Sequence, residues 1–251
     1  MIKNTLFIFL AILFCQVNIF AQIDTIQVDR NDLKTEILKE ERTKYLVYIE
    51  KPDGSIMDIS IWEKEISFSK MNGEDVIVIN QEWKNPDSKK TRSIKSINKR
   101  QNFKPLYHYI KDGKGTIEAY TFFDDKIIGT DSIKENSKKG FYIKKNSNTL
   151  NWELDMEVIQ ILPYKKNTSF KINFYHPGSK GRTPKYYTYD VIGESSLDLL
   201  DGKKVDCWML GIKYSSKNHA TFWVSKNSNE LLKMVESFGL IKRYKIRLAN
   251  K

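Results

Sequence analysis

The chain has 251 residues, of which 42 are Lys or Arg, 31 are Asp or Glu and 40% are hydrophobic, and its formal net charge is +11. This length suits one large or two small domains and can bury a core without disulfides. Beyond the N-terminal 21 residues no apolar run approaches the roughly eighteen residues of a membrane span. We therefore expect the mature chain to be soluble or peripheral to a membrane.

The first 21 residues have the pattern of a secretory signal peptide. Lys3 precedes the apolar run TLFIFLAILF, which is too short to span a bilayer. A small residue, Ala21, stands at the expected cleavage position, so we predict cleavage between Ala21 and Gln22. The mature chain, 22–251, then has a formal charge of +10, because Lys3 is removed. The prediction is an exported protein, either periplasmic or peripheral to the outer membrane.

The two cysteines carry alternative interpretations. Cys15 suggests lipidation, but Phe14 before it is too bulky for the small-residue position of a lipoprotein signal, so we predict that the chain is not a lipoprotein. Cys207 is alone in the mature chain and cannot form an intramolecular disulfide. It is either a redox thiol or a core residue, and the neighbouring Asp206, Trp208 and Met209 favour the core.

Alternation of apolar and polar residues dominates the chain and predicts strands. Residues 31–43 have apolar residues at helical spacing after a candidate cap, although a first strand fits them too. Predicted strands lie at 43–50, 75–83, 115–123, 140–145, 169–175, 186–193, 204–214, 219–225 and 240–248. Turn sequences rich in Gly, Asn and Asp separate many of them. Without a linker or a shift in composition, 22–251 is predicted to be a single domain.

Two segments between 151 and 248 have informative patterns. In 151–164, Asn151 is a candidate N-cap, acidic residues occupy the first turn and Pro163 ends a predicted helix. Such a helix among strands is predicted to cover the sheet. In 240–248, one face has Leu240, Tyr244, Ile246 and Leu248, with only Lys242 out of pattern, and the other has Arg243, Lys245 and Arg247, which predicts a half-buried strand. The fold class predicted is mainly β: an antiparallel β-barrel or half-barrel of roughly eight to twelve strands with one or two short helices.

No motif for catalysis, a metal or a cofactor is present in the sequence. The three histidines, His108, His176 and His219, fit no metal-ligand spacing, and no glycine-rich phosphate loop occurs. Carboxylate groups near Asp124 and Asp155 are more simply a hairpin turn and a helix N-terminus. We expect no cofactor and no enzymatic activity.

A basic tract runs from Lys89 to Arg100 and contains six cations and no acid. It lacks the interleaved aromatics that stack on bases, so nucleic acid is not a predicted partner. A solvated strand edge is the simpler interpretation. Contact with an anionic membrane surface or with surface polysaccharide is the alternative.

The tryptophans have two interpretations, because core packing and the lining of an apolar cavity use the same residue type. They lie in five different predicted elements, at Trp62, Trp83, Trp152, Trp208 and Trp223. Trp152, Trp208 and Trp223 are our candidate ligand-binding residues, as the wall of a cavity around the helix.

The C-terminal half resembles a family of exported proteins, the domain of unknown function 3108. The family has a strand with the pattern V-x-G-x-E. Val191 and Gly193 match this pattern, whereas Ser195 occupies the position of its glutamate and Glu194 comes one place earlier. The resemblance also rests on the sequences ILPY at 161–164 and WVSK at 223–226, and on the basic strand at 241–248. Such proteins resemble the lipoprotein-carrier (Lol) half-barrel, a curved sheet around a helix and an apolar cavity. The composition and the signal ending FAQ resemble exported proteins of Bacteroidetes.

Two functions are compatible with this resemblance. The first is non-catalytic binding or carriage of an apolar ligand, a lipid or an acyl chain, in the cell envelope. The second is a structural or interaction protein that scaffolds an envelope complex. The first requires a cavity beside the helix, and the second a packed interior.

Overall fold

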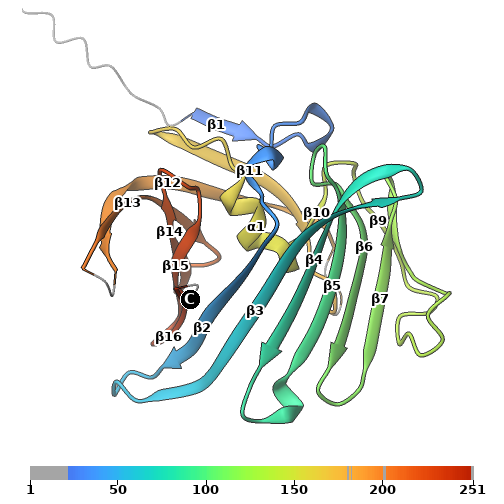
Figure 1. Ribbon diagram of the computed structural model, residues 1–251, viewed down its shortest axis with the longest axis horizontal. Helices are drawn as coiled ribbons and strands as arrows, with labels where there is room; N and C mark the ends of the chain where they lie inside the picture. Colours follow the sequence, from blue (N-terminus) through green and yellow to red (C-terminus); the bar gives the residue numbers. More distant parts are fainter. Residues whose placement is uncertain (1–21, 180, 182, 200–201, 250–251) are drawn as a thin grey trace, which may run out of the picture.

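All strands of the described chain belong to one curved sheet (Figure 1). The structure is a computed structural model that describes residues 22–179, 181, 183–199 and 202–249. The predicted signal segment and Ala21 lie outside these residues, and Gln22 is the first residue of β1. The strands are β1 (Gln22–Thr25), β2 (Glu41–Glu50), β3 (Ile56–Met71), β4 (Glu74–Lys84), β5 (Arg92–Lys99), β6 (Pro105–Asp112), β7 (Ile117–Phe122), β8 (Lys126–Gly129), β9 (Tyr142–Lys144), β10 (Leu150–Asn151), β11 (Thr168–Tyr175), β12 (Lys185–Asp198), β13 (Lys204–Lys213), β14 (Asn218–Ser225), β15 (Leu231–Phe238) and β16 (Ile241–Arg247).

The strand order is that of two meanders joined edge to edge. Strands β11 to β16 follow one another as antiparallel neighbours, and β2 to β9 do the same. The last strand, β16, pairs with β2, and the rings of Tyr48 and Tyr244 stack across this junction with centroids 4.8 Å apart. The first strand, β1, lies at one end of this order, paired with β11, whereas β16 lies in its middle. The C-terminal strand is consequently a central strand.

The prediction of a mainly β, mostly antiparallel fold is confirmed. Among the strands of the described residues, only β1 and β10 run parallel to a neighbour, which is β11 for both. The described residues contain 16 strands, more than the eight to twelve expected, because several strands have polar inward faces that hide their alternation. The path begins at β1 and ends at β9 without pairing these strands to each other, so the sheet is open.

A short helical segment lies on the concave side of the sheet (Figure 1). It consists of the 3₁₀ turn η4 (Trp152–Leu154) followed by α1 (Asp155–Gln160). As predicted, the Asn151 side chain caps it, accepting a hydrogen bond from the Glu153 backbone N–H at 3.1 Å. Five of the six residues of α1 are buried, so this segment fills the space inside the curve of the sheet.

The main hydrophobic core is formed by this segment together with strands of both meanders. The core residues nearest the helix include Val158, Ile159, Phe170, Phe174, Tyr189, Leu210 and Phe222, all at most 1% exposed. Burial at this level leaves no solvent contact, and it stabilises each large side chain by about 1.5–3 kcal/mol. The core therefore packs directly against the helix.

Cys207 is fully buried as well, which confirms its assignment to the core.

The segment at 31–43 does not form an α-helix. It contains the 3₁₀ turn η2 (Thr35–Ile37), preceded by η1 (Val28–Arg30) and followed by β2. Asn31 adopts the left-handed conformation with φ of 58° and ends η1. Such a residue does not continue a right-handed helix. The remaining 3₁₀ turn is η3 (Ser88–Lys90). No helix among the described residues is long and apolar enough to cross a membrane.

Candidate binding groove

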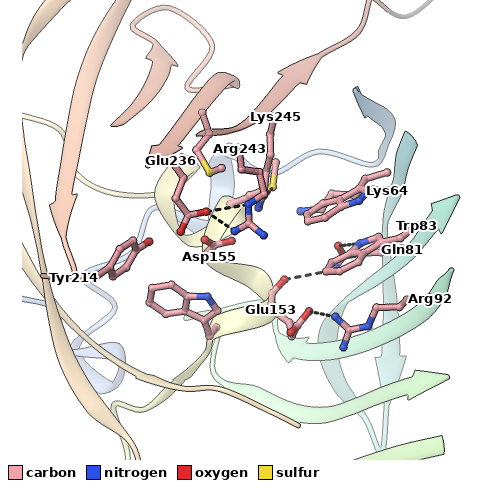
Figure 2. A pocket seen from close by; sticks show the side chains of 14 residues that line it. Lys64, Gln81, Trp83, Arg92, Glu153, Asp155, Tyr214, Glu236, Arg243 and Lys245 are labelled. Carbon is pink, nitrogen blue, oxygen red and sulfur yellow. Dashed lines mark hydrogen bonds and ion pairs between the residues drawn. The ribbon is translucent and has the colours of Figure 1, made fainter. Parts of the chain in front are cut away.

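Two adjoining pockets open on the concave side of the sheet, beside the N-terminal end of the helical segment. The first, which we call the charged pocket, has a volume of about 230 Å³. Figure 2 shows side chains converging on it from β3, β4 and β5 on one side and from β15 and β16 on the other, together with Tyr214, the residue after β13. Its lining consists of Trp62, Lys64, Gln81, Trp83, Arg92, Trp152, Glu153, Asp155, Met156, Tyr214, Met234, Glu236, Arg243 and Lys245.

The second, which we call the aromatic pocket, is wider, with a volume of about 870 Å³. It shares Trp152, Tyr214 and Glu236 with the charged pocket, so the two form one groove. Its remaining lining consists of His176, Gly181, Thr183, Lys185, Tyr186, Tyr187, Thr188, Asp190, Lys213, Asn218 and Phe238. The volume of the aromatic pocket alone lies in the range that proteins use for small-molecule ligands.

Two basic residues of the groove come from β16, whose orientation is the reverse of the one that its pattern predicts. Lys245 is only 6% exposed, and Arg243 and Lys245 line the charged pocket. Tyr244 lies on the opposite face, stacked on Tyr48. The prediction that the apolar face of 240–248 would be the buried one is therefore wrong. The basic face points inward because its cations find carboxylates and aromatic rings there.

Three of the four cations that line the charged pocket pair with a carboxylate. Lys64 Nζ lies 2.5 Å from Glu157 Oε1, and both residues are at most 5% exposed. Arg243 Nε donates to Glu236 Oε2 at 2.9 Å. Arg92 Nη1 lies 3.8 Å from Glu153 Oε2. Burial raises the pKa of Glu153, and the nearby Arg92 opposes this shift.

The fourth cation, Lys245, has no carboxylate within ion-pair distance among the described residues. Its Nζ lies 3.7 Å from the sulfur of Met156 and 4.5 Å from the centre of the Trp62 ring. Burial lowers the pKa of this ammonium to about 8, although the Asp155 carboxylate acts against the shift. Lys245 is thus a buried ammonium held mainly by a ring and a thioether.

A row of aromatic and basic side chains crosses the floor of the charged pocket. Trp62 and Trp83 are directly opposite on β3 and β4, and their rings stack with centroids 3.7 Å apart and planes at 1°. Arg92 is opposite Trp83 on β5, with its guanidinium 4.7 Å from the Trp83 ring. Lys245 and Arg92 therefore each contact one member of the tryptophan pair. Cation–π contacts of this kind contribute about 0.5–2 kcal/mol each.

The aromatic pocket is built around Trp152. The Trp152 ring lies 4.2 Å from the His176 ring and 4.6 Å from the Tyr187 ring, measured between centroids. His176 Nε2 and the Tyr187 hydroxyl are hydrogen bonded at 2.7 Å. The Tyr214 ring is 6.1 Å from Trp152. These rings give the groove an apolar wall, whereas Lys185, Lys213 and Asp190 make its rim polar.

The structure does not bring together the three tryptophans that we proposed as a cavity wall. Trp152 lies in the groove. Trp208 stacks on Tyr164 at 6.0 Å, contacts Lys226, and lines a separate pocket with Ile192 and Gly193. Trp223 alternates along β14 with fully buried residues, so it lies on the outer face, beneath Lys233 Nζ at 5.1 Å. A ligand role for each of them stays a prediction, but they do not share one site.

The basic tract from Lys89 to Arg100 forms part of η3 and strand β5 and the residue after it. Three of its six charges are matched by carboxylates of neighbouring residues. Arg92 points into the groove, Lys90 pairs with Asp58, and Lys99 Nζ lies 2.6 Å from Glu74 Oε1. The tract therefore presents less free positive charge outward than its sequence indicates. Contact with an anionic membrane surface stays a prediction.

Most residues of the groove were not predicted as site residues. Lys64 and Lys245 lie in segments whose patterns resemble ordinary surface charge. The signal in the sequence is weak, namely a charge at a position where alternation requires an apolar residue, as Lys64 is between Trp62 and Ile66. No group of three or more His, Cys, Asp and Glu side chains that could hold a metal ion occurs among the described residues.

The fold and the groove define a class of protein: an open antiparallel sheet, curved around a short helical segment, with a charged and aromatic groove at its concave mouth. The family model described as "Protein of unknown function (DUF3108)" matches residues 44–245, and the chain belongs to this family. The family predicted from the C-terminal motifs is therefore confirmed, and the match extends over most of the chain.

Solved structures similar to this chain include the following two. One is the crystal structure of a beta-barrel-like protein of the domain of unknown function DUF1849 from Brucella abortus. It has a TM-score of 0.49 and 8% identity, and the match covers 82% of this chain and 95% of that one. The other is a DUF1329 family protein from Desulfovibrio piger, with a TM-score of 0.35, 9% identity and 88% coverage of each chain. No curated protein matches the chain. The resemblances to the lipoprotein-carrier half-barrel and to Bacteroidetes proteins stay predictions.

Proposed function

We propose that this chain binds an amphipathic ligand in its groove, without catalysis, in the cell envelope to which the predicted signal peptide directs it. The observation that carries this proposal is the Trp152 cluster, in which rings of Trp152, Tyr187 and Tyr214 line an open pocket of about 870 Å³. Rings that face an open pocket offer apolar surface to a ligand.

The ligand that we propose differs from a purely apolar chain in one respect. The core between the helical segment and the sheet is filled by residues such as Val158 and Phe222, both fully buried. The open space lies instead beside the N-terminal end of the helical segment, where polar and aromatic side chains alternate. This arrangement suits a molecule with an apolar part and a polar head, such as a lipid with a single acyl chain.

The expected affinity is moderate. Burial of a methylene yields about 0.8 kcal/mol, so a chain of about twelve carbons yields roughly 10 kcal/mol when fully buried. Association itself costs on the order of 4–15 kcal/mol. A groove that is open on one side buries only part of the chain. We therefore expect binding in the micromolar range or weaker.

The proposal predicts that Trp152 contributes to binding and that Trp223 does not. We expect dodecyl maltoside and laurate, titrated below their micelle concentrations, to give saturable heats in calorimetry. Trp152→Ala should weaken this binding about tenfold or more, because it removes the central ring of the apolar wall. Tyr187→Ala is a second variant of the same wall.

Trp223→Ala is the matched control, because it removes the same ring from the outer face of β14. Circular dichroism of each variant establishes that it remains folded. Absence of saturable binding of both amphiphiles by the unaltered protein would refute the proposal. Equal weakening by Trp152→Ala and Trp223→Ala would refute the location.

Scaffolding of an envelope complex through a sheet edge receives less support. The two end strands of the sheet are short, with four residues in β1 and three in β9. Short end strands offer few free backbone groups for pairing with another chain.

A further inference from the structure

The charged pocket contains one cation whose charge the protein leaves without an opposite partner. Of its four cations, Lys64, Arg92 and Arg243 each pair with a carboxylate. Lys245 pairs with none among the described residues and is 6% exposed. A buried ammonium is unfavourable unless it is paired. The burial of Lys245 therefore indicates an anionic partner from outside the chain.

The carboxylates nearest Lys245 do not fill this role. Glu236 accepts a hydrogen bond from the Arg243 guanidinium. The charge of Asp155 favours the Lys245 ammonium, but its carboxylate lies beyond ion-pair distance. Lys245 contacts the Trp62 ring and the Met156 sulfur, and both are weak partners for a charge. The ammonium borders a pocket of about 230 Å³, roughly the volume of seven or eight waters. This space suits a ligand's head group and is too small for a whole lipid.

We infer that Lys245 receives the anionic group, a carboxylate or a phosphodiester, of the ligand whose apolar part lies against Trp152. This inference rests on the proposed function and specifies the class of ligand: a single-chain amphiphile with an anionic head. The two pockets share Trp152, Tyr214 and Glu236, so head and chain are placed side by side in one groove. Asp155 and Glu236 face the same space, and their charges select a singly charged head over a doubly charged one.

Matched amphiphiles test the inference. Laurate, lauroyl-lysophosphatidylglycerol and dodecyl maltoside have chains of similar length, whereas only the first two carry an anionic head. We expect the two anionic amphiphiles to bind more tightly than the maltoside in calorimetry. Lys245→Met should weaken the binding of the anionic pair by about ten- to hundredfold, because a charge-assisted contact is lost, and should leave the maltoside unchanged.

Lys233→Met is the matched control, because Lys233 lies over Trp223 on the outer face much as Lys245 lies over Trp62 in the groove. It should change no affinity. Urea unfolding of Lys245→Met should show a protein at least as stable as the unaltered one at neutral pH, so that weaker binding is not the result of unfolding.

The outcomes separate the inference from the proposed function. Binding of all three amphiphiles that Lys245→Met does not alter overturns the inference and leaves the proposed function standing. Binding of none overturns the proposed function. In that case a titration with inorganic phosphate decides the inference: binding that Lys245→Met abolishes supports an anion site for a free phosphate, and absence of binding overturns the site.

Discussion

Replacing Lys64 with methionine is expected to destabilise the protein by about 3–5 kcal/mol, because it leaves a carboxylate buried without a counter-charge. Lys64 is 5% exposed and Glu157 is 1% exposed, and their charged atoms are 2.5 Å apart. The second oxygen of Glu157, Oε2, already lacks a hydrogen-bond partner among the described residues. Urea unfolding at pH 7, followed by circular dichroism, measures the change in the free energy of unfolding.

Two further variants identify the cause of this loss. The double variant Lys64→Met/Glu157→Leu should recover most of the stability, because an apolar pair of similar size replaces a buried ion pair. Lys44→Met is the control, since Lys44 pairs with Glu63 at 3.2 Å but has a side chain that is 57% exposed. It should cost less than about 1 kcal/mol. A loss of that small size for Lys64→Met would mean that the pair does not stabilise the fold.

The same pair shows why part of the sheet could not be predicted from its alternation. On β3 the buried positions are Ser60, Trp62, Lys64 and Ile66, so a charge occupies a place where an apolar residue was required. On β5 they are Ile94, Ser96 and Asn98. A strand with a polar buried face has the pattern of a surface segment. These strands were consequently absent from the predicted set.

The predictions that were confirmed rest on local signals. The Asn151 cap and the stop before Pro163 located the helical segment, because capping depends on residues within one turn. Strands β11, β12, β13, β14 and β16 were recognised through their alternation and the turn residues between them. These signals are independent of what packs against the segment from elsewhere in the chain.

The groove could not be predicted, because it depends on pairing between distant residues. Lys245 and Trp62 are brought together only because β16 pairs with β2 and β2 with β3. Alternation in β16 divides its residues into two faces correctly but does not say which face is inside. That choice depends on Glu236 on the neighbouring strand β15 and on the Trp62 ring on β3, which the pattern of β16 itself does not contain.

Acid is expected to destabilise the protein through a single buried histidine. His108 is fully buried on β6, and burial lowers its pKa from 6.5 to about 3, with a smaller contribution from the charge of Arg92. Above pH 6.5 the imidazole is neutral in both the folded and the unfolded state, so it contributes no pH dependence. Between pH 6.5 and 3 only the unfolded state binds the proton, and stability therefore falls as pH falls. The loss attributable to His108 reaches at most about 5 kcal/mol at pH 3.

Comparison of two histidine variants isolates this contribution from that of the carboxylates. His108→Gln removes the titrating group and keeps a side chain able to hydrogen bond Ser96, whose hydroxyl lies 2.8 Å from His108 Nδ1. The decline in the free energy of unfolding between pH 7 and pH 4, measured in urea, should be shallower in this variant by about 1.4 kcal/mol per pH unit below pH 6.5. His219→Gln alters an exposed histidine on β14 and should leave the slope unchanged. Equal slopes in His108→Gln and the unaltered protein would mean that the imidazole is protonated in the folded state, which requires water or an anion at Nε2, an atom without a partner among the described residues.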